Sequence, residues 1–159
     1  MYVTRTQTAS ANISRAKIWG WDTSLNYQTK WFNWDLAYNR TRGKDKSRNG
    51  ELNAKSGDWL ADISPDTVTS SLDVPLGETG LSAGWVATFA ERAKRVPATY
   101  SEQGGYGVND FYLSYKGRDR LQGMTTTVVL GNAFDKEYYS PQGVPQDGRN
   151  AKLLVSYQW

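Results

Sequence analysis

Residues 17–28 read KIWGWDTSLNYQ and residues 32–39 read FNWDLAYN, and these two stretches decide the fold. From Trp19 to Tyr27 nearly every second residue is aromatic or aliphatic, and the residues between them are small or polar. The second stretch repeats this alternation after a short break at residues 28–30. A period of two places neighbouring side chains on opposite faces of a β-strand. The two stretches therefore predict a hairpin whose strands each have one aromatic–aliphatic face and one polar face.

The same alternation recurs along the rest of the chain, and helical spacing of apolar residues does not. We predict seven strands, at residues 16–28, 31–41, 66–75, 81–91, 108–116, 121–132 and 150–159, and residues 1–14 could hold the end of another. The connections alternate between short turns and long polar loops. This asymmetry is typical of outer-membrane β-barrels. A soluble antiparallel barrel or sandwich is the alternative, but it would rarely expose so many tryptophans and tyrosines.

Composition narrows the functional classes. The chain has 159 residues, 7 Trp, 10 Tyr and 15 Gly, but no His and no Cys. The missing types exclude histidine-based acid–base chemistry, Ser-His-Asp triads, cysteine nucleophiles, disulfides and His or Cys metal sites. The formal net charge of +3 comes without a basic cluster, so nucleic-acid binding is not expected. No run is long enough for a transmembrane helix, and no signal peptide is visible. We expect no catalytic residues and no enzyme activity.

The end of the chain resembles the C-terminal barrel-assembly signal of outer-membrane proteins. That signal has apolar residues at alternate positions and a terminal aromatic residue. Here the matching residues are Ala151, Leu153, Val155, Tyr157 and Trp159. Together with the loop asymmetry, this match favours an antiparallel transmembrane β-barrel meander.

Several short motifs are similar to those of TonB-dependent receptors and occur in that family's order. Residues 16–21 (AKIWGW) resemble the strand entry A-x-I-x-G-x-E, and Asp22 follows as the acidic residue. Residues 38–45 (YNRTRGKD) and 60–65 (LADISP) resemble Y-T-x-G-x-D … L-x-x-I-x-P. Residues 105–112 (GYGVNDFY) resemble G-Y-x-V-x-D-L-Y.

The fourth motif lies near the C-terminus. Residues 131–139 (GNAFDKEYY), followed by Gly148, Arg149 and the last strand, resemble N-L-F-D-K-x-Y … G-R … S-Y-x-F. Ala133 replaces the family's Leu and Trp159 its Phe, and both changes are conservative for a lipid-facing or interfacial position. Within the family the match is closest to the haem and haemoglobin or haemophore receptors.

The resemblance implies that residues 1–159 are the C-terminal segment of a 22-stranded barrel, with the plug domain, the TonB-contacting segment and the earlier strands outside this chain. It implies an outer-membrane location and uptake of haem or another iron carrier. The implied partners are the rest of the barrel, the plug, the TonB system, outer-membrane lipids, lipopolysaccharide, the barrel-assembly machinery and a haem-carrier protein. A complete eight-stranded barrel with a structural or adhesive role is the alternative, with residues 2–9 as its first strand.

The chain offers few candidate ligand sites. Tyr138 or Tyr139 could lie near haem iron, which tyrosine can bind, but we favour an interfacial aromatic pair in a loop pinned by Asp135 or Lys136. We expect no cofactor bound by this segment itself, and haem only as transported ligand. Three other groups are weaker candidates, and for each we favour an ordinary or solvated loop. The carboxylates Glu51, Asp58, Asp62 and Asp66 could form a calcium site, and residues 104–107 could form a phosphate-binding loop. Arg92, Lys94 and Arg95 could contact lipopolysaccharide phosphate.

The alternation also assigns faces. We expect Trp19, Trp34 and Phe111 to face lipid. The residues expected to face the lumen are Asp22, Asn26, Asn33, Asp35, Asn39, Asp73, Asp110, Lys152 and Gln158.

Overall fold

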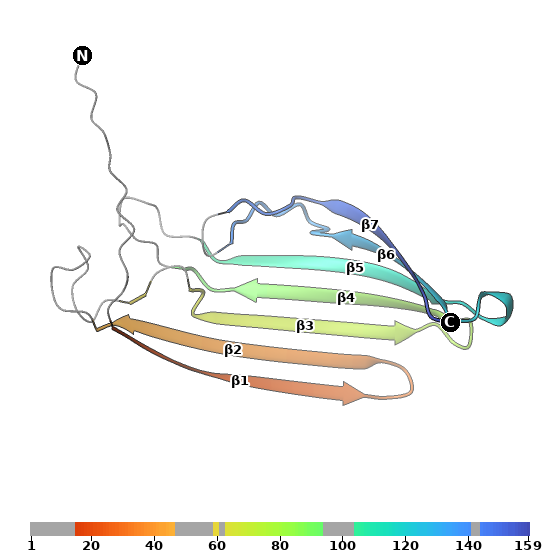
Figure 1. Ribbon diagram of the computed structural model, residues 1–159, viewed down its shortest axis with the longest axis horizontal. Coiled ribbons are helices and arrows are strands. Elements are labelled where there is room, and N and C mark those ends of the chain that lie inside the picture. Colours follow the sequence, from red (N-terminus) through yellow and green to blue (C-terminus); the bar gives the residue numbers. More distant parts are fainter. Residues whose placement is uncertain (1–14, 47–58, 61–62, 94–103, 141–143) are drawn as a thin grey trace, which may run out of the picture.

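Seven strands form one antiparallel sheet in the computed structural model, which describes residues 15–46, 59–60, 63–93, 104–140 and 144–159. The strands are β1 (Ala16–Gln28), β2 (Asn33–Asp45), β3 (Asp66–Pro75), β4 (Leu81–Ala90), β5 (Tyr106–Lys116), β6 (Met124–Gly131) and β7 (Asn150–Tyr157), with a short 3₁₀ turn, η1 (Asp119–Leu121). Each strand pairs with the next in the sequence, as Figure 1 shows. The predicted all-β meander is therefore confirmed. Within the described part of the chain, no helix is long and apolar enough to cross a membrane.

Short and long connections lie at opposite ends of the sheet. Residues 29–32, 76–80 and 117–123 close the short turns, and the C-terminus lies at this end (Figure 1). The second turn uses Gly77 and Gly80, whose φ angles of 63° and 82° lie in the left-handed region that glycine enters without strain. Residues 46–65, 91–105 and 132–149 connect the strands at the other end. We call the two ends the short-turn end and the long-loop end.

Several strand boundaries differ from the prediction by one or two residues, and the two larger differences have identifiable reasons. β2 continues to Asp45 rather than ending at residue 41, because residues 41–45 pair with residues 16–20 of β1. The segment after β2 also returns alongside it: Leu60 N donates to Gly43 O at 2.8 Å, and Thr41 N donates to Pro65 O at 2.8 Å. β6 begins at Met124 rather than residue 121, because η1 and Gly123, with φ of 87°, occupy the preceding residues.

The sheet has no dry core among the described residues. Its buried apolar residues are small, namely Ala87, Ala90, Ala93 and Val108. In contrast, Leu153 is 67% exposed and Trp21 is 52% exposed. A soluble sandwich must bury its apolar sheet face against a second layer. This sheet leaves that face uncovered along its whole width, as a wall facing lipid requires.

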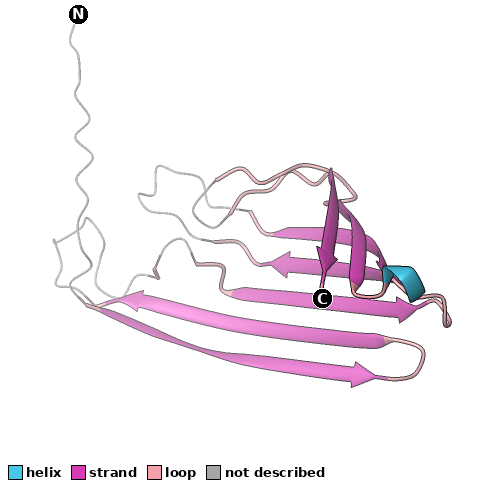
Figure 2. Cartoon of the chain, turned by 45° about the vertical axis from the view of Figure 1, so that its right-hand side comes forward, coloured by secondary structure: helices cyan, strands magenta, loops and turns pink. Residues whose placement is uncertain are grey.

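The sheet is curved and open. Figure 2 shows β6 and β7 inclined steeply to β1–β5. Within the described residues, β1 pairs only with β2 and β7 only with β6, so the two outer strands do not meet. This arrangement does not favour a closed seven- or eight-stranded barrel. Residues 2–9, the possible first strand of such a barrel, lie outside the described residues.

Candidate functional site

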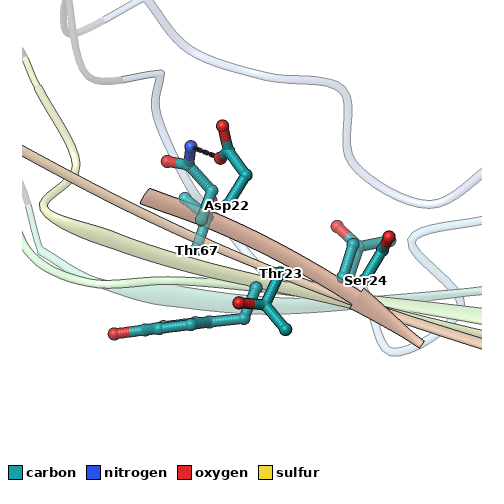
Figure 3. A pocket seen from close by; sticks show the side chains of 8 residues that line it. Asp22, Thr23, Ser24 and Thr67 are labelled. Atoms are coloured by element: carbon teal, nitrogen blue, oxygen red, sulfur yellow. Dashed lines mark hydrogen bonds between the residues drawn. The ribbon is translucent and has the colours of Figure 1, made fainter. Parts of the chain in front are cut away.

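The strand registers sort the side chains into two faces. Asp22 pairs with Asn39 and Asn39 with Thr67, so these residues share one face, which we call the polar face. Trp21 pairs with Arg40 on the opposite, apolar face. Figure 3 shows Asp22, Ser24 and Thr67 on one side of the strands and Thr23 on the other.

The predicted face assignments agree with these registers. The polar face carries eight of the nine residues expected in the lumen: Asp22, Asn26, Asn33, Asp35, Asn39, Asp73, Asp110 and Lys152. The ninth, Gln158, lies beyond the end of β7, where no strand pairing assigns it to a face. The apolar face carries Trp19, Trp34 and Phe111, which were expected to face lipid, and also the alternate residues of β7. A sheet with these two faces can separate lipid from water.

A hydrogen-bonded network covers the polar face near the short-turn end. Asn26 Nδ2 donates to Asn33 Oδ1 at 3.0 Å and to Asp35 Oδ1 at 2.6 Å. Asn33 Nδ2 donates to the other oxygen of Asp35 at 3.0 Å, and the hydroxyl of Tyr112 donates to Asp73 Oδ1 at 2.8 Å. The carboxylates of Asp35 and Asp73 accept these bonds while half-buried, so the hydrogen bonds hold an acidic surface that water still reaches.

A depression of about 210 Å³ lies farther along the polar face. Its polar lining includes Asp22, Ser24, Asn39 and Thr67, and Asn39 Nδ2 donates to Asp22 Oδ1 (Figure 3). Sites for drug-sized molecules usually enclose roughly 300–1,000 Å³ and are mostly apolar. The depression is therefore part of a wetted wall rather than a separate ligand site.

Asn132 anchors the loop of residues 132–149 at the long-loop end. Its side chain is buried, donates to Lys136 O at 2.8 Å and Asp147 O at 3.1 Å, and accepts from Lys136 N at 2.8 Å. Its backbone N–H donates to Asp110 Oδ1 at 2.6 Å. The anchor is thus Asn132, where the sequence pointed to Asp135 or Lys136. The φ angle of Asn132 is 47°, in the left-handed region that asparagine tolerates better than most residues. The residue type at position 132 was therefore the signal that the sequence offered.

Asp135 makes a further contact within the same loop. Its Oδ1 accepts from Arg149 N at 2.8 Å, and this bond joins the FDK motif to the Gly148-Arg149 motif. The two motifs are fourteen residues apart in the sequence and adjacent in space. Their spacing therefore reflects the closure of one loop.

Tyr138 and Tyr139 occupy different environments. The Tyr138 ring lies 4.7 Å from the Tyr106 ring, beside a cavity of about 250 Å³ that Asp110 and Lys152 also line. Burial, followed by the neighbouring Tyr106 and the carboxylates, raises the pKa of Tyr138 above its ordinary value. A raised pKa disfavours the phenolate that would bind ferric iron. Tyr139 forms a β-bridge with Pro145 and is exposed.

The proposed assembly signal lies on the final strand. Ala151, Leu153, Val155 and Tyr157 alternate on the apolar face of β7, and all are exposed. Trp159 lies just beyond the strand and is fully exposed. The geometry presents a continuous apolar row that runs along β7 from the long-loop end to the short-turn end, and the role of that row in assembly stays a prediction.

The remaining candidates do not form sites in the described residues. Asp66 accepts from the hydroxyl of Tyr38 at 2.7 Å and from Arg42 at 2.9 Å, so its oxygens are used in this contact. Glu51, Asp58, Asp62, Lys94 and Arg95 lie outside the described residues. Residues 104–105 lead directly into β5, as expected for an ordinary loop. Within the described part, no group of three His, Cys, Asp or Glu residues could hold a metal ion.

One cluster was missed by the sequence analysis. Arg40, Arg42 and Lys44 alternate along the part of β2 near the long-loop end and share the apolar face with Trp19 and Trp21. They were assigned largely to a loop because charges and Gly43 follow Tyr38. Their i, i+2, i+4 spacing was the signal that the strand continues.

Comparisons with known proteins agree with the two-faced sheet. Residues 2–133 match the family model described as "TonB dependent receptor-like, beta-barrel". The chain is 61% identical over 159 residues to a hemin receptor of Yersinia enterocolitica, covering 100% of this chain and 22% of that protein. It is 60% identical over 152 residues to a hemin receptor of Yersinia pestis, covering 96% of this chain and 21% of that protein. The chain thus spans about a fifth of the length of these curated relatives.

Solved structures show the same fold. The copper transporter OprC aligns with a TM-score of 0.73 at 20% identity, covering 89% of this chain and 24% of that one. The FrpB iron transporter from Neisseria meningitidis aligns with a TM-score of 0.69 at 20% identity, with the same coverage of 89% and 24%. These two proteins are similar to this chain in architecture.

Proposed function

The chain belongs to the TonB-dependent receptor β-barrel family, and from this premise we propose that it forms the C-terminal section of the barrel wall in an outer-membrane receptor that takes up haem. The proposed whole protein adds the remaining strands of a 22-stranded barrel and a plug domain. The Yersinia relatives at about 60% identity are hemin receptors, and this supports haem as the cargo.

The observation that carries the proposal is the division of one sheet into two unlike faces. Trp19, Trp34 and Phe111 lie on a face that nothing in the described chain covers. Asp35 and Asp73 lie on the other face with their hydrogen-bond partners. Lipid covers the apolar side chains of the first face, and water or a polar plug forms hydrogen bonds with the second.

In this function the segment binds and guides but changes no bond in the cargo. Loops at the long-loop end face the cell exterior and contribute to ligand capture, together with loops supplied by the rest of the barrel. The TonB system then acts on the plug, and cargo passes along the polar face. We propose no enzyme activity for the segment.

Iron ligation is proposed to come from other parts of the receptor. The raised pKa of Tyr138 and its packing against Tyr106 fit a structural role. The further proposed partners are outer-membrane lipids and lipopolysaccharide around the apolar face, a haem-carrier protein at the loops, and the barrel-assembly machinery at the row that ends in Trp159.

The test is uptake by the full-length receptor in a Gram-negative host that cannot synthesise haem and lacks its own haemin receptor. We expect growth on haemin with the receptor and an intact TonB system, and none when either is missing. Growth on haemin that is independent of TonB would contradict the mechanism. If the receptor gives no growth on haemin but restores growth on another iron carrier in an iron-limited host that can synthesise haem, the proposed cargo is wrong.

A further inference from the structure

Charged residues are distributed unevenly on the apolar face. Among the described strand residues of this face, every charged side chain lies near the long-loop end of β1, β2 and β3. These side chains are Lys17, Arg40, Arg42, Lys44 and Asp66. We call Lys17, Arg40, Arg42 and Lys44 the outer cationic cluster.

The register brings two like charges together in this cluster. Lys17 and Lys44 are directly paired across β1 and β2, and like charges in this position destabilise a sheet. Within the described residues neither lysine forms a salt bridge, because the ion pairs of this region involve only the two arginines. Among the described residues, the two lysines therefore have no anionic partner.

The arginines are only partly neutralised. Asp66 lies 3.6 Å from Arg40 and 2.9 Å from Arg42, and Glu91 lies 3.7 Å from the other terminal nitrogen of Arg42. That nitrogen is buried and makes no hydrogen bond. Counting only the residues that the structure describes, two carboxylates oppose four cations, and the cluster is positive.

Two tryptophans form an aromatic floor beside the lysines. The Trp19 and Trp59 rings are 5.9 Å apart. Lys44 Nζ lies 4.7 Å from the Trp59 ring, and Lys17 Nζ lies 5.9 Å from the Trp19 ring. Tryptophans in a membrane protein gather at the boundary between hydrocarbon and headgroups. This tendency predicts headgroup depth for the cluster, where lysine and arginine meet lipid phosphates.

We propose that the outer cationic cluster binds the phosphate groups of a phosphorylated glycolipid in the outer leaflet, with Trp19 and Trp59 packed against its sugar or upper acyl part. This inference rests on the proposed function, because it needs the apolar face to meet lipid and the long loops to face outward. Lys17 and Lys44 supply the free charges, and the phosphate relieves their mutual repulsion. The short-turn end of this face has no charged strand residue in the described chain, so the site belongs to one leaflet.

The test uses the full-length receptor in detergent and measures retained lipid by native mass spectrometry with added bisphosphorylated lipid A. We expect the wild-type receptor to retain the lipid. The Lys17→Gln/Lys44→Gln variant should lose affinity roughly ten- to thirtyfold, since each lysine near a phosphate contributes substantially. The matched control is Lys116→Gln/Arg118→Gln, which removes two charges at the short-turn end and should bind as the wild type does. The charge-preserving Lys17→Arg/Lys44→Arg variant should also retain binding.

Three results would overturn the proposal. They are equal retention of dephosphorylated lipid A, equal retention of phosphatidylglycerol, and equal loss of affinity in the control variant. Inorganic phosphate should compete only weakly, and strong competition would mark a free-phosphate site instead. Growth on haemin is measured for the same variants. If growth on haemin persists while lipid binding falls, uptake does not depend on this lipid site. If the wild-type receptor itself fails to support growth on haemin, the proposed uptake function is contradicted. Should the double variant not assemble, either single substitution replaces it.

Discussion

Trp21 and Asp22 are consecutive in the sequence and face different solvents. The indole of Trp21 lies on the apolar face and contacts the ring of Tyr38, with ring centroids 4.9 Å apart. The carboxylate of Asp22 lies on the polar face and accepts from Asn39. The same contrast extends across all seven strands. The sheet is therefore a boundary, whose stability depends on two different media rather than on a core.

The largest expected effect concerns the two open edges of the sheet. Unpaired backbone groups on β1 and β7 have no partners in lipid, so this chain alone should not insert as a stable monomer. Heat-modifiable migration in detergent gels checks this, with the full-length receptor as the folded reference. A heat-modifiable monomer formed by the isolated chain would contradict the fragment interpretation.

The second prediction places the same substitution on each face. Val128 and Val129 are adjacent on β6, with Val128 exposed on the apolar face and Val129 opposite Lys152 on the polar face. Val128→Lys in the full-length receptor should cost about 2–4 kcal/mol, as charges do near the middle of a barrel's lipid face. Val129→Lys should cost under about 1 kcal/mol, mainly through repulsion from Lys152.

The measurement for this pair is the fraction of receptor that assembles in the outer membrane. Assembly should fall strongly for Val128→Lys and little for Val129→Lys. Equal losses, or the reverse order, would contradict the assignment of the apolar face to lipid and the polar face to water.

The third prediction compares two asparagines on the polar side. Asn132 is 3% exposed and its side chain makes three hydrogen bonds to backbone groups, whereas Asn26 bonds side chains in an exposed position. Asn132→Ala should release the loop of residues 132–149 and cost about 1–3 kcal/mol, because buried backbone groups lose partners. Asn26→Ala should cost less, because water replaces the amide.

Limited proteolysis of the assembled receptor checks the asparagine comparison. Cleavage within the loop should increase for Asn132→Ala only. Unchanged cleavage in that variant would show that Asn132 is not the anchor.

The smallest expected effect concerns Tyr138. With its pKa raised by burial, the phenol stays neutral at pH values where an ordinary tyrosine ionises. A raised folded-state pKa contributes stability below the ordinary tyrosine pKa, and this contribution is lost as the pH rises through the folded value. Tyr138→Phe should remove one tyrosinate step that lies above the ordinary tyrosine pKa, with Tyr139→Phe as the control, and should change haemin uptake less than about twofold. Loss of the haem absorption band in Tyr138→Phe would instead identify an iron ligand.

The faces were predictable from the sequence because parity alone sets them. Trp19, Trp34 and Phe111 needed no knowledge of contacts between strands. The extension of β2 was missed because the charges and Gly43 after Tyr38 suggested a loop, whereas in the structure these residues pair with β1, and Leu60, a residue distant in sequence, lies against Gly43. Asn132 was missed for a similar reason, since its partners Lys136 and Asp147 come together only when the loop closes.

The central claim is that one face of the sheet meets lipid and the other meets water. Single-cysteine spin labels at positions 33–40 of β2 in the assembled receptor test it directly, and this chain has no cysteine to interfere. Collisions with oxygen, which concentrates in lipid, should peak at positions 34, 36 and 38, and collisions with a soluble nickel chelate should peak at 33, 35, 37 and 39. Both reagents peaking at the same positions, or profiles without a period of two, would contradict the claim.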